Sequence, residues 1–256
     1  MSDKDLMGTH MKEFERATAT VLPVHTNTVI RVDGKAFHTF TRGLSTPFDD
    51  RFMDAMDATA LYLCENISGA VLAFTQSDEI SIVLADYSKP STEPWMGGKV
   101  QKVTSIAASM ATAAFNRAFA DPDKMALFDA RVFTLPHIAD VQDYLIWRQK
   151  DTYRNAVSMV SSEFFSHNYL HGLGVNERLT LLHTGGVHLS DYPDKCFKGR
   201  ITEPKFSTET ITYTRKDTGE EITVKDVVRK QWVTHTAPDF SSMYSLRSYF
   251  PAAVSK

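Results

Sequence analysis

The hydrophobic pattern of the first half of the chain switches between strand-like and helix-like spacing. Compact β-branched or alternating apolar runs predict strands, and apolar residues at every third or fourth position predict helices. The predicted strands are 27–32, 70–75, 80–84 and 128–135, and the predicted helices are 49–67 and 100–119. Only four polar residues separate the second strand from the third, so these two should form a tight antiparallel hairpin.

The order of these elements is strand, helix, strand, strand, helix, strand, which is the split βαβ plan of a ferredoxin-like domain. We therefore expect an α+β fold. Pro136 closes the last of these strands, and the pattern changes after it. This change divides the chain into a first domain, 1–137, and a C-terminal part, 138–256.

The remaining segments predict helices and a hairpin. A short helix over 12–18 precedes the first strand, and one long helix or two abutting helices should cover 139–171. Further on, 208–214 should pair with 221–225 in a hairpin, and Trp232 begins a possible last strand. The C-terminal part is thus expected to be a helical and β-hairpin extension.

Composition indicates a folded protein and gives no direct sign of a nucleic-acid partner. The 256 residues are 43% hydrophobic and include 16 Phe and 9 Tyr, enough for a substantial core. The net charge is only -3, so there is no overall basic field, although a local basic face is still compatible with the sequence. The two cysteines, Cys64 and Cys196, make neither a CxxC pair nor a disulfide framework. No apolar stretch approaches the roughly 20 residues of a membrane span, so we expect a cytoplasmic protein with reduced thiols.

Three carboxylates stand where predicted neighbouring strands end. Asp33 follows the first strand, while Asp78 and Glu79 occupy the hairpin turn, so all three should converge at one edge of the sheet. Ionised carboxylates close together repel one another, and Mg²⁺, which prefers oxygen ligands, relieves that repulsion. Two such ions about 4 Å apart can activate an attacking oxygen and neutralise a leaving pyrophosphate. The three carboxylates therefore predict metal-dependent nucleotidyl transfer.

The segment after Asp33 favours the same interpretation. Gly34 has no side chain, so the backbone can approach a ligand closely, and Arg31 adds positive charge. The amides expected to wrap around a triphosphate as a nest are those of Gly34, Lys35, Ala36, Phe37 and His38. Alternatively, Asp33-Gly34 is a plain turn and Asp78-Glu79 is an exposed hairpin tip. Their presence on neighbouring predicted strands favours a site.

Three ordered motifs extend this pattern over most of the chain. They are VDGKAFHTFTRG at 32–43, FTQSDEISIV at 74–83 and YLIWRQKDTYRNAV at 144–157. Weaker matches are GVHLSDYPDKCFKGR at 186–200 and WVTHTAPDFSS at 232–242. Together they resemble the tRNA(His) guanylyltransferase family, and its short bacterial and phage branch most closely.

The resemblance implies a palm-like catalytic domain, similar to those of DNA polymerases and nucleotide cyclases. It also implies an enzyme that adds nucleotides to the 5′ end of tRNA or a similar RNA, in the 3′-to-5′ direction. Members activate a 5′-monophosphate with ATP or GTP, and the 3′-hydroxyl of an incoming NTP then attacks the activated end. A homotetramer built from two dimers follows by analogy alone.

The resemblance also implies a role for individual residues. Asp33, the Gly34 carbonyl and Asp78 would hold two Mg²⁺ ions, and Glu79 would support them as the fourth member of the metal site. The residues implied to contact a nucleotide are Arg31, Gly34, Lys35, Ala36, Phe37, His38, Asp49, Ser77, Lys102, Arg131 and Asn155.

One departure from the family follows Asp151. Eukaryotic members commonly read His-Ile-Asn-Asn-Leu-Tyr-Asn there, whereas this chain reads Tyr-Arg-Asn-Ala-Val-Ser-Met at 153–159 and keeps only Asn155. The missing His helps to recognise tRNA(His). Its absence argues against strict guanylate addition to that tRNA and favours template-dependent 5′-end repair or another RNA.

Two other functions share parts of the pattern. A nucleotide cyclase of the GGDEF type would have a similar palm and similar carboxylates, but the C-terminal part and the WRQxD motif argue against it. A catalytically inactive RNA- or nucleotide-binding module would have little need for all three carboxylates.

Other polar and aromatic features have simpler interpretations. His167 and His171 are spaced as helical neighbours, but no Cys or carboxylate nearby completes a zinc site. The basic residues within 195–230 favour a solvated face over an RNA contact. Three aromatic residues favour core packing over base stacking, namely Trp232, Tyr244 and Tyr249.

Overall fold

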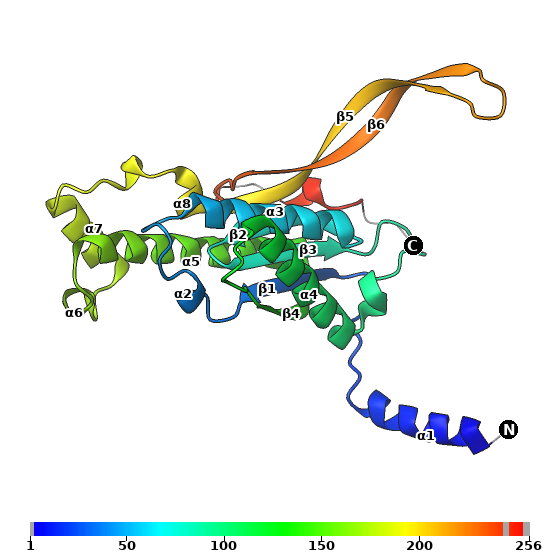
Figure 1. The fold of residues 1–256 in the computed structure, drawn as a ribbon, viewed down its shortest axis with the longest axis horizontal. Helices are drawn as coiled ribbons and strands as arrows, with labels where there is room; N and C mark the ends of the chain where they lie inside the picture. Colours follow the sequence, from blue (N-terminus) through cyan, green and yellow to red (C-terminus); the bar gives the residue numbers. More distant parts are fainter. Residues whose placement is uncertain (1–2, 243–245, 253–256) are drawn as a thin grey trace.

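The computed structural model describes residues 3–242 and 246–252, and its strands form one six-stranded sheet (Figure 1). The sheet order is β4-β1-β3-β2-β5-β6, and every neighbouring pair is antiparallel. The strands are β1 (Asn27–Gly34), β2 (Ala70–Gln76), β3 (Glu79–Ala85), β4 (Phe128–Leu135), β5 (Arg200–Thr214) and β6 (Glu221–Thr236). The helices are α1 (Asp3–Ala17), α2 (Phe37–Phe40), α3 (Asp50–Asn66), α4 (Val100–Phe119), α5 (Ile138–Phe164), α6 (His167–Leu170), α7 (Val175–Thr184) and α8 (Asp194–Lys198). Short 3-10 turns lie at Trp95–Gly98, Leu189–Asp191 and Arg247–Tyr249.

Helices cover both faces of the sheet, and strand alternation supplies a core to each. On one face, α3 and α4 pack over Ile30 and Ile82, with Phe115 among the fully buried side chains (Figure 1). On the other face, α5 packs over Val29 and Val83. All residues of β2 and β3 are buried because these strands lie inside the sheet and are covered on both sides.

The α+β prediction is confirmed, and the first six predicted elements are present in the predicted order. Several predicted boundaries were wrong. The first helix covers Asp3–Ala17 rather than 12–18. The first strand continues through Gly34, because Asp33 still pairs with β3 and β4. The segment at Trp232 is part of β6 rather than a separate last strand.

Two segments extend away from the body of the molecule (Figure 1). The β5–β6 hairpin is much longer than 208–214 with 221–225, and its base joins the main sheet where Arg200 pairs with Thr75. The sheet therefore crosses the expected boundary at 137. Helix α1 projects on the opposite side of the body. No helix in the described part of the chain is both long enough and apolar enough to cross a membrane.

The aromatic residues and the histidine pair singled out in the sequence lie outside the carboxylate region, and the described ones have surroundings that suit a structural role. Trp232 is 9% exposed and belongs to the core under α3 and α4, as expected. Tyr249 packs partly against the other core and donates a hydrogen bond to Glu203. Tyr244 lies outside the described residues. The rings of His167 and His171 are 6.2 Å apart, and no group of three potential metal ligands is found among the described residues.

Candidate functional site

The three predicted carboxylates do come together at one end of the sheet. The β1–β3 register sets Asp33 directly opposite Glu79, so both side chains lie on the face that α5 covers. The two-residue turn between β2 and β3 brings Asp78 beside the end of β1, where the Gly34 amide donates to the Asp78 carbonyl oxygen at 3.1 Å. Tertiary pairing thus joins residues that are 45 positions apart in the sequence (33 and 78).

The turn that carries Asp78 is strained and electrostatically unfavourable. Ser77 has a φ of 44°, in the left-handed region that residues with a side chain seldom adopt. Burial, together with the negative charges of Asp33 and Glu79, raises the pKa of Asp78 to about 6. A bound cation would relieve both the burial cost and the repulsion.

Glu79 has a different environment from Asp78. Its two carboxylate oxygens accept hydrogen bonds from Arg148 of α5, at 2.8 Å from Nε and 2.7 Å from Nη2. Burial raises the pKa of Glu79, and the positive charges of Arg148 and Arg31 oppose that rise. Glu79 therefore lies beside the other two carboxylates with both oxygens already engaged.

The donor set suits a magnesium ion better than a transition metal. Mg²⁺ usually takes one or two carboxylates and leaves its other positions to water and substrate phosphate. Asp33 and Asp78, with the Gly34 carbonyl at the end of β1, provide such a partial set. A complete protein cage, of the kind that zinc uses, is not found in the part of the chain that the structure describes.

The segment after Asp33 has less free backbone than the predicted nest requires. The Gly34 amide donates to the carbonyl oxygen of Asp78, and the Lys35 amide donates to that of Leu127. The prediction that five free amides form the nest was therefore wrong for Gly34 and Lys35. The amides of Ala36, Phe37 and His38 have no acceptor in the described chain. Gly34 is required by packing, since a Cβ there would lie 2.2 Å from the Phe37 ring.

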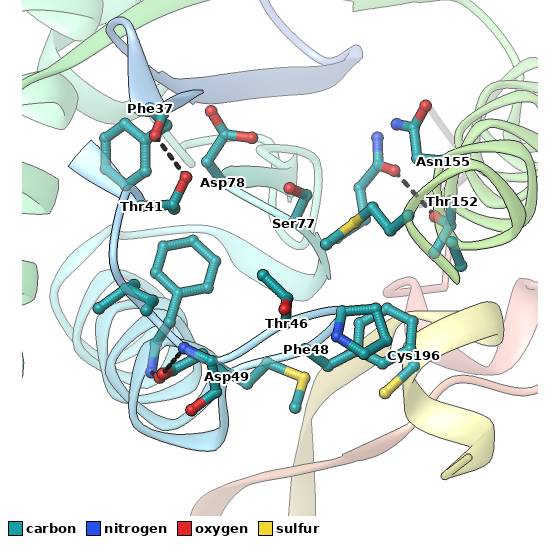
Figure 2. Close-up of a pocket in the computed structure, with 18 of the residues that line it drawn as sticks. Phe37, Thr41, Thr46, Phe48, Asp49, Ser77, Asp78, Thr152, Asn155 and Cys196 are labelled. Carbon is teal, nitrogen blue, oxygen red and sulfur yellow. Dashed lines mark hydrogen bonds between the residues drawn. The ribbon is translucent and has the colours of Figure 1, made fainter. Parts of the chain in front are cut away.

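An apolar pocket of about 420 Å³ opens next to the Asp78 turn (Figure 2). Figure 2 shows Asp78 and Ser77 on one side of the hollow, with Phe48 and Cys196 on the other. The predicted residues that line it are Phe37, His38, Asp49, Ser77, Asp78 and Asn155. The pocket has the size and the mixed lining of a small-ligand site.

Asp49 lines the pocket, but its carboxylate is occupied. It accepts hydrogen bonds from the amides of Phe52, at 2.8 Å, and Ser45, at 3.0 Å, and so caps α3. Burial would raise the pKa of Asp49, but these bonds outweigh that effect and lower it. Any contact between Asp49 and a ligand must leave this cap intact or break it.

The predicted basic residues are distributed unevenly. Arg131 of β4 lies 3.9 Å from Asp33, and about half of its side chain is exposed. Arg31 is partly buried, with its Nε 3.9 Å from Glu79, and this Nε has no hydrogen-bond partner among the described residues. Lys35 is exposed beside the acidic turn, whereas Lys102 lies on the exposed surface of α4 and does not line the pocket.

Sequence reasoning missed the polar residues that α5 and β5 bring to this region. Arg148 binds Glu79, while Thr152 and Arg200 line the pocket. The WRQKD motif contains Arg148 three positions before Asp151, which is the helical spacing of an ion pair and the one available signal. No local pattern indicates that Arg148 also pairs with Glu79, because these two residues are 69 positions apart in the sequence.

The fold and the site define a mixed α and antiparallel β protein with an acidic sheet edge beside a ligand-sized pocket. A family model described as tRNAHis guanylyltransferase matches residues 8–136, which is half of the chain. The chain therefore belongs to the tRNA(His) guanylyltransferase family, a family of nucleotidyltransferases.

Solved structures support this assignment over nearly the whole chain. A bacterial tRNA(His) guanylyltransferase-like protein in complex with ATP is 32% identical, with a TM-score of 0.78, over 94% of this chain and 96% of that one. A complex with GTP gives 33% identity and a TM-score of 0.75, over 92% and 94% of the two chains.

Curated relatives match over a shorter stretch. The tRNA(His) guanylyltransferase of Schizosaccharomyces pombe is 36% identical over 155 residues, 57% of this chain and 56% of the relative. The uncharacterized protein R259 of Acanthamoeba polyphaga mimivirus is 32% identical over 185 residues, 62% of this chain and 63% of the relative. The match thus spans less than two thirds of the length of these relatives.

Proposed function

We propose that this protein adds nucleotides to the 5′ end of tRNA or a similar RNA, in the 3′-to-5′ direction, with Mg²⁺ and NTPs. The observation that carries the proposal is the acidic pair Asp33 and Asp78, of which Asp78 lines an apolar pocket of nucleotide size, in a member of this family. The similarity to bacterial proteins solved with ATP and with GTP supports NTPs as the ligands.

The acidic turn would hold the metal. Asp33, Asp78 and the Gly34 carbonyl are the ligands in this proposal, and Glu79 supports them from its bonds with Arg148. Two bound Mg²⁺ ions would neutralise phosphate charge and favour ionisation of the attacking 3′-hydroxyl. The protein's own part is to fix these carboxylates on a rigid sheet edge, so that little reorganisation is needed during the reaction.

The pocket would hold the nucleotide beside that turn. Its apolar side chains, including Phe48, Met53 and Met159, suit a base that is removed from water. The unpaired amides of 36–38 and the positive charges of Lys35 and Arg131 suit the triphosphate. In this proposal the RNA 5′-monophosphate would first attack the α-phosphate of an NTP and release pyrophosphate, which leaves the 5′ end activated by a nucleoside monophosphate. The 3′-hydroxyl of the incoming NTP would then attack the RNA 5′-phosphate, and the activating nucleoside monophosphate would leave.

The domain organisation and the RNA preference are also part of the proposal. We propose that the first four strands with α3 and α4 act as a palm-like domain and that the C-terminal part, 138–256, shapes the RNA site. The loss of the family His at Tyr153 favours 5′-end repair over strict tRNA(His) guanylylation. A homotetramer and a cytoplasmic location stay predictions.

Incubation with Mg²⁺, NTPs and a 5′-monophosphorylated tRNA that lacks its first nucleotide tests the proposal. We expect the RNA to grow by nucleotides at its 5′ end, which sequencing of that end would show. A cyclic nucleotide formed without RNA would instead assign the protein to the cyclases. RNA binding with no product of either kind would identify an inactive binding module.

A further inference from the structure

Helix α5 contacts the residues on both sides of the turn that carries Asp78. Gln76 and Glu79 are paired across β2 and β3, so they flank this two-residue turn. Arg148 of α5 donates two hydrogen bonds to Glu79. The Thr152 hydroxyl, one helical turn further on, lies 3.0 Å from Gln76 Oε1 and shares its proton between that oxygen and the Arg148 carbonyl oxygen, also at 3.0 Å. A single face of one helix thus holds both ends of the turn.

These two contacts are buried and geometrically specific. The side chains of Arg148 and Glu79 are each 8% exposed, and their pairing uses two parallel N–H···O bonds. Arg148 is itself fixed by Asp151, at 2.9 Å, and by the Trp147 ring, 4.5 Å from its guanidinium carbon. Arg148 therefore has one well-defined position.

The turn needs such support. The left-handed backbone of Ser77 is strained and persists only when its surroundings hold it. Asp33 and Glu79 also lie directly opposite each other on one face, an arrangement that is unfavourable for like charges. Arg148 neutralises Glu79 and keeps it turned toward α5, which leaves Asp33 and Asp78 facing the position proposed for the metal.

We propose that Arg148 and Thr152 form a clamp that holds the Ser77-Asp78 turn in its metal-binding shape, with Glu79 as an anchor for Arg148 and not as a metal ligand. Both are positioning residues. This inference rests on the metal site of the proposed function. The same helix lines the nucleotide pocket with Asn155 and Met159, so the clamp also fixes the metal site relative to the pocket wall.

Two variants test the clamp from its two ends. Arg148→Lys keeps the positive charge but loses the planar fork that binds both oxygens of Glu79. Thr152→Val has nearly the same shape and removes only the hydroxyl that reaches Gln76. Arg154→Met is the matched control, since Arg154 is on the same helix, pairs with the same Asp151 and is 56% exposed, but does not contact Glu79.

Mn²⁺ binding, measured by the electron paramagnetic resonance of the free ion, tests whether the clamp supports the metal site and does not require catalysis. With a non-reactive GTP analogue present, we expect Arg148→Lys and Thr152→Val to weaken Mn²⁺ binding roughly 10- to 100-fold, the usual cost of losing a residue that orients metal ligands. The number of sites at saturation should stay the same, which a general loss of folded structure would not allow. Arg154→Met should bind Mn²⁺ as the wild type does.

The clamp is refuted if both variants fold, by thermal melting, and bind Mn²⁺ as tightly as the wild type. It is also refuted if the wild type binds no Mn²⁺ with the analogue. Should Arg148→Lys not fold, Thr152→Val alone decides in the same way. Wild-type Mn²⁺ binding with the expected losses, but no 5′ extension of RNA, would keep the clamp and reject the proposed function.

Discussion

Asp78 should destabilise the metal-free protein, and removal of its charge should therefore stabilise it. Burial and the nearby charges of Asp33 and Glu79 raise the pKa of Asp78 to about 6 in the folded protein, from an ordinary value of 3.8. A carboxyl whose pKa is raised by folding contributes stability that is fully present below about pH 3.8 and is lost as the pH rises through about 6. The gap between the two values corresponds to about 3 kcal/mol at pH 8.

Urea unfolding of the wild type and of Asp78→Asn, in EDTA, measures this effect. Asn has nearly the size of Asp and carries no charge, so the variant should be more stable by about 3 kcal/mol at pH 8 and by about half of that at pH 5. A gain of this size at pH 8 corresponds to a melting temperature roughly 6 to 12 °C higher. Asp239→Asn is the control, because hydrogen bonds from Ser241 lower the pKa of the exposed Asp239 and no stabilisation is expected there.

Two results would refute this reasoning. If Asp78→Asn were no more stable than the wild type at pH 8, the carboxylate would not be under electrostatic strain. If the gain were equal at pH 5 and pH 8, it would come from the amide's hydrogen bonds and not from the missing charge. Addition of Mg²⁺ and GTP should stabilise the wild type and leave the variant unchanged.

Three further substitutions test the packing and the pocket. Gly34→Ala should lower stability by about 1–3 kcal/mol in urea unfolding, because its Cβ would overlap the buried Phe37 ring; equal stability would contradict the close contact. Asp57→Asn should cost about 1–3 kcal/mol in the same assay, since it leaves the buried Arg200 charge without its ion-pair partner, while burial raises the pKa of Asp57 and so offsets part of the loss; a gain in stability would argue against that pair. Met159→Glu should weaken binding of a fluorescent GTP analogue about tenfold or more while the melting temperature changes little, because Met159 lines the pocket yet is 41% exposed; unchanged affinity would place the nucleotide outside this pocket.

Local sequence signals were sufficient for most elements of the first half. The helix predicted over 100–119 is α4, Val100–Phe119, and the helix predicted over 49–67 is α3, Asp50–Asn66, with Asp49 as its N-cap. Amphipathic spacing and capping residues are properties of neighbouring positions, so a single sequence displays them. The β2–β3 hairpin was predictable for the same reason, because a short polar gap can close only as a tight turn.

Long-range pairing could not be read in the same way. The β5–β6 hairpin extends far beyond its predicted ends toward the main sheet, because the residues there, 200–207 and 226–236, lack the regular apolar–polar alternation that a half-buried strand shows. The sheet also joins the two predicted parts through Thr75 and Arg200, which are 125 positions apart (75 and 200). Strand order depends on which faces are buried together, and no local pattern states that.

The candidate site was predictable where residue type and element ends coincided. The convergence of Asp33, Asp78 and Glu79 followed from their places at the ends of adjacent strands, and the structure brings them together. The sequence did not predict that Glu79 is held apart from the other two carboxylates, because this depends on its pairing with Arg148 of a distant helix. The sequence also could not show whether the Asp49 carboxylate caps a helix or contacts a ligand, because aspartate serves in both roles.

The most direct test compares 5′-end extension by the wild type, Asp78→Ala and Asp239→Ala under single-turnover conditions, with RNA binding measured in parallel. We expect extension by the wild type and Asp239→Ala, and a loss of at least a hundredfold in Asp78→Ala with RNA affinity retained, because this carboxylate would hold the metal and would not hold the RNA. Full activity of Asp78→Ala, with the same product at the RNA 5′ end, would contradict the assignment of the chemistry to the acidic turn.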